Sequence, residues 1–296
     1  MNRSVVAFIV LLIIGAVLSF SLQYYQSNHT SRKASPGGAF PSRIICAAPS
    51  AVEIVFALDC GDRVVGVSDF VAYPPEAVDK PLIGGYFNPN YERILSMKAD
   101  LLILQGESEK LTLFCKDNQI QLLRIDMTDI ETILNDVRRV GKTLGVNENA
   151  AALIQTMQER LDNVKKQASE IQPKPNVFIS LGRKSSALSN ITTCGGGTFL
   201  SELLTLAGGE NTFGDLGDEY PQISLEAITK REPEVILDFQ LENTRDAAKA
   251  ALDWQSASLL PAVENQRVYA VTESFFLIPG PRMPQAAERL VELIHG

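Results

Sequence analysis

Histidine is nearly absent from the 296-residue chain, which contains only two. His29 lies in a polar stretch near the N-terminus, and His295 lies at the C-terminal end. A histidine-rich zinc or manganese site therefore lacks its ligands, and no Ser-His-Asp or Cys-His arrangement can form. The Gly-x-Ser-x-Gly elbow of α/β hydrolases is missing as well. The sequence therefore predicts a protein that is not an enzyme and has no catalytic residues, no metal site and no cofactor.

Basic residues are also scarce. The chain has 27 lysines and arginines against 35 aspartates and glutamates, which gives a formal net charge of −8. Binding to nucleic acid normally requires a basic stripe, and none stands out, so nucleic acid is not an expected partner. A hydrophobic content of 45% and a charged content of 21% are typical of a globular protein. The length suits one large domain or two of ordinary size.

The N-terminus carries a long apolar run. Met1-Asn2-Arg3 precedes apolar residues from Val5 to Leu18, which continue more weakly to Leu22. This pattern predicts that residues 1–22 are a signal peptide or an uncleaved, membrane-spanning signal anchor. Residues 23–42 are polar and rich in Ser, Gly and Pro, which is typical of a flexible tether. We therefore expect an exported protein whose folded body begins near Arg43.

Cysteine is present but forms no Cys-x-x-Cys motif. The chain has Cys46, Cys60, Cys115 and Cys194. Export permits disulfides, and Cys46 and Cys60 are separated by one expected helix, so they could approach each other. Buried free thiols are the alternative, and the sequence does not choose among the pairings.

A single long amphipathic helix is expected from Asn147 to Ile171. Its apolar residues recur every three or four positions: Ala150, Ile154, Met157, Leu161, Val164, Ala168 and Ile171. Asn147 is a plausible N-cap, and Pro173 and Pro175 follow the far end. At about 1.5 Å per residue the helix spans roughly 35–40 Å. We expect residues 147–172 to connect two lobes; an ordinary surface helix within one domain is the alternative.

Strands and helices alternate on both sides of this helix. Strands are expected at 43–47, 64–67, 101–104 and 121–125, and again at 176–181, 235–238 and 267–271. Helices are expected between them, including 91–97, 129–144, 198–207, 224–230, 246–254 and 284–295. Alternation of this kind predicts parallel sheets with right-handed crossovers. The predicted fold class is α/β, with two Rossmann-like lobes at 43–146 and 173–296 and a ligand cleft between them.

The two predicted lobes contain an internal echo. Glu92 begins a short helix eight residues before Asp100, which precedes a buried strand. Glu226 begins another short helix eight residues before Glu234, which also precedes a buried strand. The repeated spacing indicates that the two lobes are related.

Four stretches carry a resemblance to a known family: RIICAAPSAVEIVFALDCGDRVVGVSDFVAYPPEA, GGYFNPNYERILSMKADLLI, GGGTFLSELLTLAGGENTF and YPQISLEAITKREPEVI. They resemble the periplasmic substrate-binding proteins of ABC importers for cobalamin, haem and iron-siderophores, over about residues 43–296. The resemblance implies two α/β lobes joined by one long helix, a periplasmic location and a monomer. It also implies a small-molecule ligand and, as partner, an ABC permease dimer in the inner membrane. Retention on that membrane by an uncleaved anchor is the alternative location.

The resemblance also implies roles for individual residues. One acidic residue at the tip of each lobe pairs with arginines of the permease dimer, and Glu92 and Glu226 match these positions. Carboxylates that simply suit a helix N-terminus are the alternative interpretation. Cobalamin-binding relatives have aromatic residues at positions matching Tyr73, Tyr86 and Tyr220, which suit a flat macrocycle.

Three further phenylalanines are expected to open onto the same cleft: Phe87, Phe275 and Phe276. Packing beneath loops is the alternative for all six aromatic residues. Ser274 and Ile278 depart from the cobalamin pattern, which keeps two other ligands open. Haem requires an axial ligand that Tyr73 or Tyr86 would supply.

The second open ligand, a ferric siderophore, requires cationic groups. The candidates for this role are Arg183, Lys184 and Arg282. The favoured function is capture of cobalamin or a related corrinoid for delivery to the permease. A membrane-tethered sensory or scaffold module with the same fold is the alternative from a different class.

Overall fold

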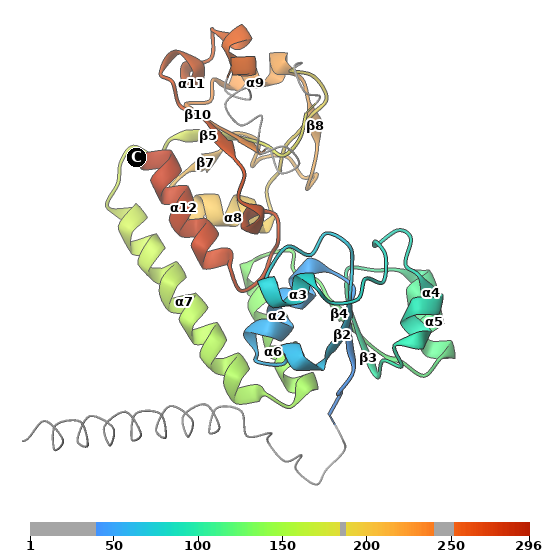
Figure 1. Ribbon diagram of the computed structural model, residues 1–296. Helices are drawn as coiled ribbons and strands as arrows, with labels where there is room; N and C mark the ends of the chain where they lie inside the picture. Colours follow the sequence, from blue (N-terminus) through green and yellow to red (C-terminus); the bar gives the residue numbers. More distant parts are fainter. Residues whose placement is uncertain (1–39, 184–187, 240–251) are drawn as a thin grey trace, which may run out of the picture. The chain divides into compact units, whose positions relative to one another are not determined.

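Two four-stranded parallel sheets organise the structure, and each belongs to its own lobe (Figure 1). The computed structural model describes residues 40–183, 188–239 and 252–296. The expected leader, nearly all of the tether, Lys184 and most of the expected helix at 246–254 lie outside these residues. The strand orders are β2-β1-β3-β4 and β10-β9-β5-β7, and every pair in both sheets is parallel. The predicted α/β class is confirmed.

The first lobe contains β1 (Ile44–Cys46), α2 (Pro49–Ala57), β2 (Val64–Val67), α3 (Pro75–Val78), α4 (Tyr91–Ser96), β3 (Leu101–Gln105), α5 (Glu109–Asp117), β4 (Gln121–Ile125) and α6 (Ile130–Leu144). Its central strands are apolar except for Gln105 at the end of β3, because helices cover both faces of the sheet, as is usual for parallel sheets. Side chains of Asn90, Ser108 and Asp129 cap the helices that follow them.

The second lobe contains β5 (Asn176–Ser180), β6 (Ile191–Thr192), α8 (Phe199–Leu206), β7 (Glu210–Asn211), β8 (Gln222–Ile223), α9 (Leu225–Arg231), β9 (Val235–Phe239), α11 (Pro261–Glu264), β10 (Val268–Val271) and α12 (Met283–His295). The sequence did not predict the edge strand β7 or the small antiparallel pair of β6 and β8. Each of these strands has two residues, which is too short to show an alternating pattern.

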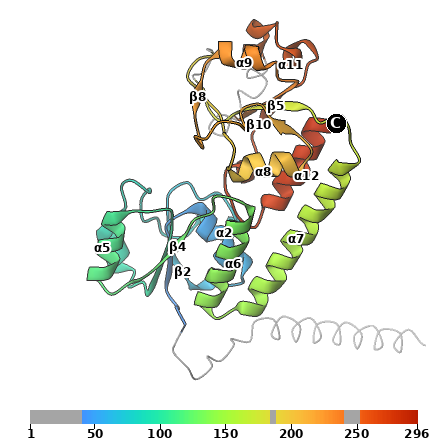
Figure 2. The ribbon, with the colours of Figure 1, turned by 180° about the vertical axis from the view of Figure 1, so that it is seen from behind.

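Helix α7 (Asn147–Ser169) is the predicted connecting helix. Six of its seven predicted apolar positions are buried, and Ile171 lies just beyond its end. It packs against α6 of the first lobe and against α8 and α12 of the second (Figure 2). The proposed N-cap was wrong by one position, because Val146 occupies it without a side-chain cap and Asn147 is already helical.

One apolar core continues from the first lobe through α7 into the second lobe. The other face of each sheet is covered by a separate cluster, one around Ile45 and Leu102 and one around Phe178 and Trp254. Residues 41–296 accordingly form one unit. Because the shared core would be exposed if the lobes separated widely, the structure favours small motions between them.

Candidate functional site

A hollow of about 590 Å³ opens at the carboxyl ends of all four strands of the first sheet. Its lining consists of the residues that follow these strands and one further loop: Ala47, Ala48, Pro49, Ser68, Asp69, Phe70, Gly85, Tyr86, Phe87, Asn88, Gln105, Gly106 and Asp126. Chain connections diverge between β1 and β3, and ligands of open α/β sheets bind at such a point. The volume lies within the usual range for small-molecule sites, roughly 300–1,000 Å³.

Two of the six predicted aromatic residues, Tyr86 and Phe87, line this hollow. Their rings meet edge to face with centroids 5.1 Å apart. The Tyr86 hydroxyl donates a hydrogen bond to the backbone carbonyl of Glu107, which holds that ring in place. Phe87 is 96% exposed, so its ring is free to contact a ligand.

Phe70 is a third aromatic lining residue, and the sequence pattern did not predict it. Its side chain is 90% exposed, and its backbone has a φ of 68°, which is uncommon for a bulky residue. Strain of this kind is concentrated at ligand-binding sites. The available signal was its position in a loop directly after a buried strand, which the residue type alone did not distinguish from an ordinary surface phenylalanine.

The polar groups of the hollow lie beside these rings. Ser68 is buried, and its hydroxyl has no hydrogen-bond partner within the described residues. The Ser50 hydroxyl donates to the side-chain oxygen of Gln105. Asp69 and Asp126 supply two carboxylates to the lining. The hollow therefore combines apolar faces with several hydrogen-bonding groups, as small-molecule sites do.

Tyr73 is not part of this lining. Its ring lies under the guanidinium of Arg282, 4.2 Å from the ring centroid. Arg282 also forms a bidentate pair with Glu53 of α2, and the Glu53 side chain is 1% exposed. Burial raises the pKa of Glu53, and the hydrogen bond from Arg282 partly opposes that rise. This cluster joins the two lobes, because Arg282 immediately precedes α12.

Phe275 and Phe276 were predicted to open onto the cleft, and both are buried in this structure. Phe276 is fully buried and packs edge to face against Phe239, with centroids 5.5 Å apart. Phe275 is almost as buried and lies 5.7 Å from the Arg282 guanidinium. Both rings belong to the shared core, because the short turn after β10 folds back onto it.

Tyr220 is half-exposed on the second lobe and lines neither of the two hollows described for the chain. Burial of its hydroxyl raises its pKa, and the nearby Glu219 raises it further. The structure thus brings Tyr86 and Phe87 together and leaves the other four predicted rings elsewhere. Whether those rings contact a ligand stays a prediction.

Arg183 and Arg282, two of the three candidate cations for a siderophore, are engaged by carboxylates. The Arg183 guanidinium bonds Asp238 at 2.9 and 3.0 Å and Asp253 at 3.0 Å. The indole N–H of Trp254 donates to the same Asp238 oxygen. The Arg183 side chain is only 2% exposed, so it forms part of the second lobe's interior.

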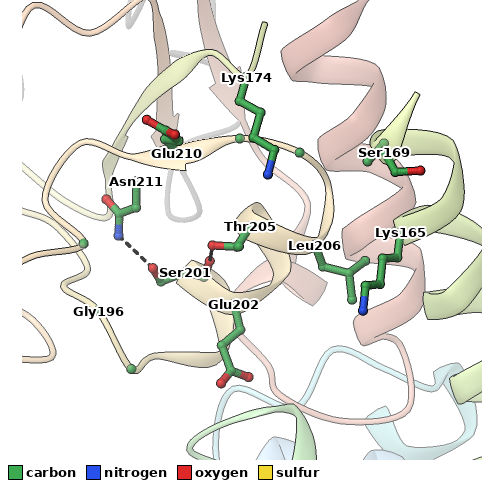
Figure 3. A pocket seen from close by; sticks show the side chains of 15 residues that line it. Lys165, Ser169, Lys174, Gly196, Ser201, Glu202, Thr205, Leu206, Glu210 and Asn211 are labelled. Atoms are coloured by element: carbon green, nitrogen blue, oxygen red, sulfur yellow. Dashed lines mark hydrogen bonds between the residues drawn. The ribbon is translucent and has the colours of Figure 1, made fainter. Parts of the chain in front are cut away.

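A second hollow, of about 870 Å³, lies in the second lobe near α7, α8 and β7 (Figure 3). Asn211 donates to the Ser201 hydroxyl at 3.0 Å, and the Glu202 carboxylate accepts the backbone N–H of Ile130 at 2.9 Å. Lys165 and Lys174 are exposed at its margin. Its described lining contains no aromatic residue and five glycines, so it offers little to a flat macrocycle.

Glu92 and Glu226 occupy equivalent places in the two lobes. Each lies exposed in the first turn of a short helix, α4 or α9. Eight residues on, Asp100 accepts the backbone N–H of Arg43 at 3.0 Å, and Glu234 accepts that of Asn176 at 2.8 Å. These bonds anchor the first strand of each lobe, so the sequence echo is also a structural one.

All four cysteines are free and buried, so the free-thiol alternative describes this structure. Burial raises the pKa of Cys115 and of Cys194 to about 11. No helix within 40–183, 188–239 and 252–296 is both long and apolar enough to cross a membrane.

Two similar lobes, a connecting helix and a hollow at strand ends define a two-lobed α/β solute-binding protein. The family model for periplasmic binding proteins matches residues 44–274. The chain belongs to the periplasmic binding protein family, as its resemblance predicted. It is therefore a binding protein and not an enzyme, and its class works with an ABC permease and a small-molecule ligand.

Several known proteins are similar to this chain. A vitamin B12-binding protein of Vibrio cholerae is 30% identical over 254 residues, covering 85% of this chain and 88% of that protein. The crystal structure of the periplasmic vitamin B12-binding protein BtuF of Vibrio cholerae has a TM-score of 0.74 at 26% identity, covering 86% of this chain and 97% of that one. The periplasmic heme-binding protein RhuT from Roseiflexus sp. RS-1 has a TM-score of 0.75 at 23% identity, covering 86% and 98%, and shares the fold.

Proposed function

We propose that this protein captures cobalamin or a related corrinoid and delivers it to an ABC permease in the inner membrane. The observation that carries the proposal is the aromatic hollow at the strand ends, where Phe70, Tyr86 and Phe87 are exposed together. Aromatic faces pack well against a wide, flat macrocycle. The similarity to proteins named for vitamin B12 binding supports the same ligand class.

The charges around the hollow favour a corrinoid over the alternatives. A ferric siderophore presents negative oxygens, but the described lining has no lysine or arginine, and Arg183 and Arg282 are held by carboxylates. Haem needs an axial ligand, but the Tyr86 hydroxyl already donates to a backbone carbonyl and Tyr73 lies outside the lining of the hollow. A corrinoid with amide side chains needs neither cation nor axial tyrosine.

Delivery requires a docking surface, which we assign to Glu92 and Glu226. Both are exposed at equivalent positions, and neither forms an ion pair within the described residues. We propose that each pairs with arginines of one permease subunit. Residues 1–22 would export the protein to the periplasm, where an uncleaved leader would also retain it on the inner membrane.

Binding by wild-type protein and two variants tests the ligand. The purified soluble body is incubated with cobalamin, haem or a ferric siderophore and desalted, and its absorption spectrum is recorded. Calorimetry then compares wild type with Tyr86→Ala and Phe70→Ala. We expect at least about tenfold weaker cobalamin binding in each variant, as for other buried aromatic contacts.

Leu259→Ala is the control, because Leu259 is about as exposed as Phe70 but lies on the second lobe outside the hollow. It should bind cobalamin as wild type does. Retention of haem or siderophore without cobalamin would overturn the corrinoid assignment, and unchanged affinity in both aromatic variants would remove the hollow from the binding site.

A further inference from the structure

The described lining of the hollow contains acidic side chains but no basic ones. Among its described lining residues, Asp69 and Asp126 are the acidic ones, and none is a lysine or arginine. Arginine and lysine are the side chains that commonly bind carboxylates and phosphates, and the described lining has neither. This hollow is therefore built for a ligand that is uncharged or cationic where it meets the two carboxylates.

The nearby cations leave at least one carboxylate unpaired. Arg139 bonds Asp136 at 2.5 Å and reaches Asp126 only at 4.0 Å, so it neutralises Asp126 weakly. Asp69 has no side-chain hydrogen bond or ion pair within the described part of the chain. Gly85 lies next to it, and a Cβ atom there would stand 3.7 Å from an Asp69 oxygen. The Asp69 carboxylate is thus left open on the side that faces this glycine.

An independent observation points to a ligand at the same place. Ser68, the residue before Asp69, is 4% exposed, and its hydroxyl has no partner within the described residues. Buried polar side-chain atoms almost always have a partner. A ligand group that both donates and accepts, such as a primary amide, would satisfy the Ser68 hydroxyl and a neighbouring carboxylate together.

The N-terminus of α2 opposes this charge but does not cancel it. Ala48 and Pro49 at its start line the hollow, and a helix N-terminus carries roughly half a positive charge. Pro49 lacks an N–H, which removes one of the donors that would bind an anion. The two carboxylates outweigh this half charge, because Arg139 offsets Asp126 only weakly, so the hollow remains negative overall.

We propose that Asp69, supported by Asp126, makes the hollow selective for amide-bearing corrinoids and excludes macrocycles that present carboxylates at the same positions. The inference rests on the proposed function and adds to it a reason why the hollow accepts some corrinoids and rejects others. An amide N–H donates to the Asp69 carboxylate, whereas a ligand carboxylate meets a like charge and has no proton to donate. Rejection by repulsion is a common source of specificity.

Two corrinoids with the same ring test the proposal: cobinamide, whose ring carries amide side chains, and cobyrinic acid, whose ring carries carboxylates. Calorimetry at pH 7.5 compares both in wild type, Asp69→Asn and Asp126→Asn. We expect wild type to prefer cobinamide by at least about tenfold, because like charges facing each other are strongly unfavourable. Asp69→Asn should reduce this ratio severalfold by improving cobyrinic acid binding, and Asp126→Asn should reduce it less.

Glu264→Gln, on α11 of the second lobe, is the control, because it makes the same change in net charge at an exposed residue outside the hollow. It should keep the wild-type ratio. Equal affinity of wild type for both corrinoids, or a ratio unchanged in both aspartate variants, would overturn the selectivity while leaving the proposed function in place. Binding of neither corrinoid by wild type would overturn the proposed function itself.

Discussion

The two lobes share a scaffold but differ in the loops that follow the carboxyl ends of their strands. In both, an acidic residue, Asp100 or Glu234, anchors the first strand through a backbone N–H. At the strand ends, the first lobe leaves Phe70 and Phe87 almost fully exposed. The second lobe instead buries an arginine with the fully buried Asp238. The repeated part of each lobe therefore supplies the frame, and the loops after the strands decide which lobe offers an open site.

This difference assigns separate tasks to equivalent positions. Features fixed by the scaffold, such as the exposed glutamates of α4 and α9, are symmetric between the lobes. Features carried by strand-end loops are asymmetric, with an open hollow in one lobe and a closed polar network in the other. Under the proposed function, the symmetric glutamates would serve docking and the asymmetric strand-end loops would serve ligand binding.

The largest expected effect comes from changing the symmetric features, the exposed glutamates Glu92 and Glu226. Glu92→Lys and Glu226→Lys combined place positive charges against permease arginines, which costs several kcal/mol. Uptake should fall by at least about 100-fold, while cobalamin affinity measured by calorimetry should stay unchanged. The two single reversals should reduce uptake by similar amounts, because the two positions are equivalent.

Uptake is measured in proteoliposomes containing the permease, and Glu264→Lys serves as the control for net charge. Normal uptake by the double variant would contradict the docking assignment. Absence of uptake with wild-type protein that binds cobalamin would instead favour the alternative of a sensory or scaffold module with this fold. Strongly unequal single variants would show that the lobes are not symmetric in docking.

A smaller effect tests the asymmetric features, the strand-end loops of the two lobes. Asp238→Ala leaves the Arg183 guanidinium buried with fewer partners, and breaking a buried pair costs about 3–5 kcal/mol of unfolding free energy. Asp69→Asn changes a carboxylate of the open hollow, and such surface changes usually stay within about 0.5 kcal/mol. Urea denaturation at pH 7 compares the two with wild type. Equal losses of unfolding free energy in both variants would mean that the strand-end residues of the first lobe contribute as much to stability as those of the second lobe.

The sequence predicted what depends on local pattern. The apolar stripe of α7, the alternation of strands and helices and the spacing of Glu92 and Glu226 were all readable, because periodicity and repeats lie within short stretches. The pairing of Glu53 with Arg282 was not, since 229 residues separate them. The left-handed backbone of Phe70 is likewise set by its tertiary surroundings.

The same reason explains where the structure differs from what the sequence suggested. Arg183 looked like an available cation, and Phe276 looked like a cleft residue, because both stand in loops. Their partners Asp238 and Phe239 come from another strand of the second lobe, so burial depends on contacts that composition does not show. Residues in strand-end loops are therefore the ones whose roles most need the structure.

The smallest expected effect concerns Glu53, where the two lobes meet. Burial raises its pKa above the usual value of about 4.3 in an unfolded chain. Between these two values the folded state binds more protons than the unfolded state, so the stability contributed by this carboxyl falls as pH rises. Relative to Glu53→Gln, wild type should therefore lose unfolding free energy as pH is raised from about 4 through the raised pKa, and level off above it.

Urea denaturation at half-unit pH steps gives this difference curve. Glu288→Gln provides the baseline, because Glu288 also forms a bidentate pair, with Arg160, but its side chain is 43% exposed and the pair joins α7 to α12. Subtracting the two variants leaves the part that belongs to the buried pair between the lobes. A difference curve that rises with pH would show that Arg282 outweighs burial at Glu53, and the contact between the lobes would then be a stabilising ion pair at neutral pH. A flat curve would show that the two effects cancel, and it too would contradict the raised pKa.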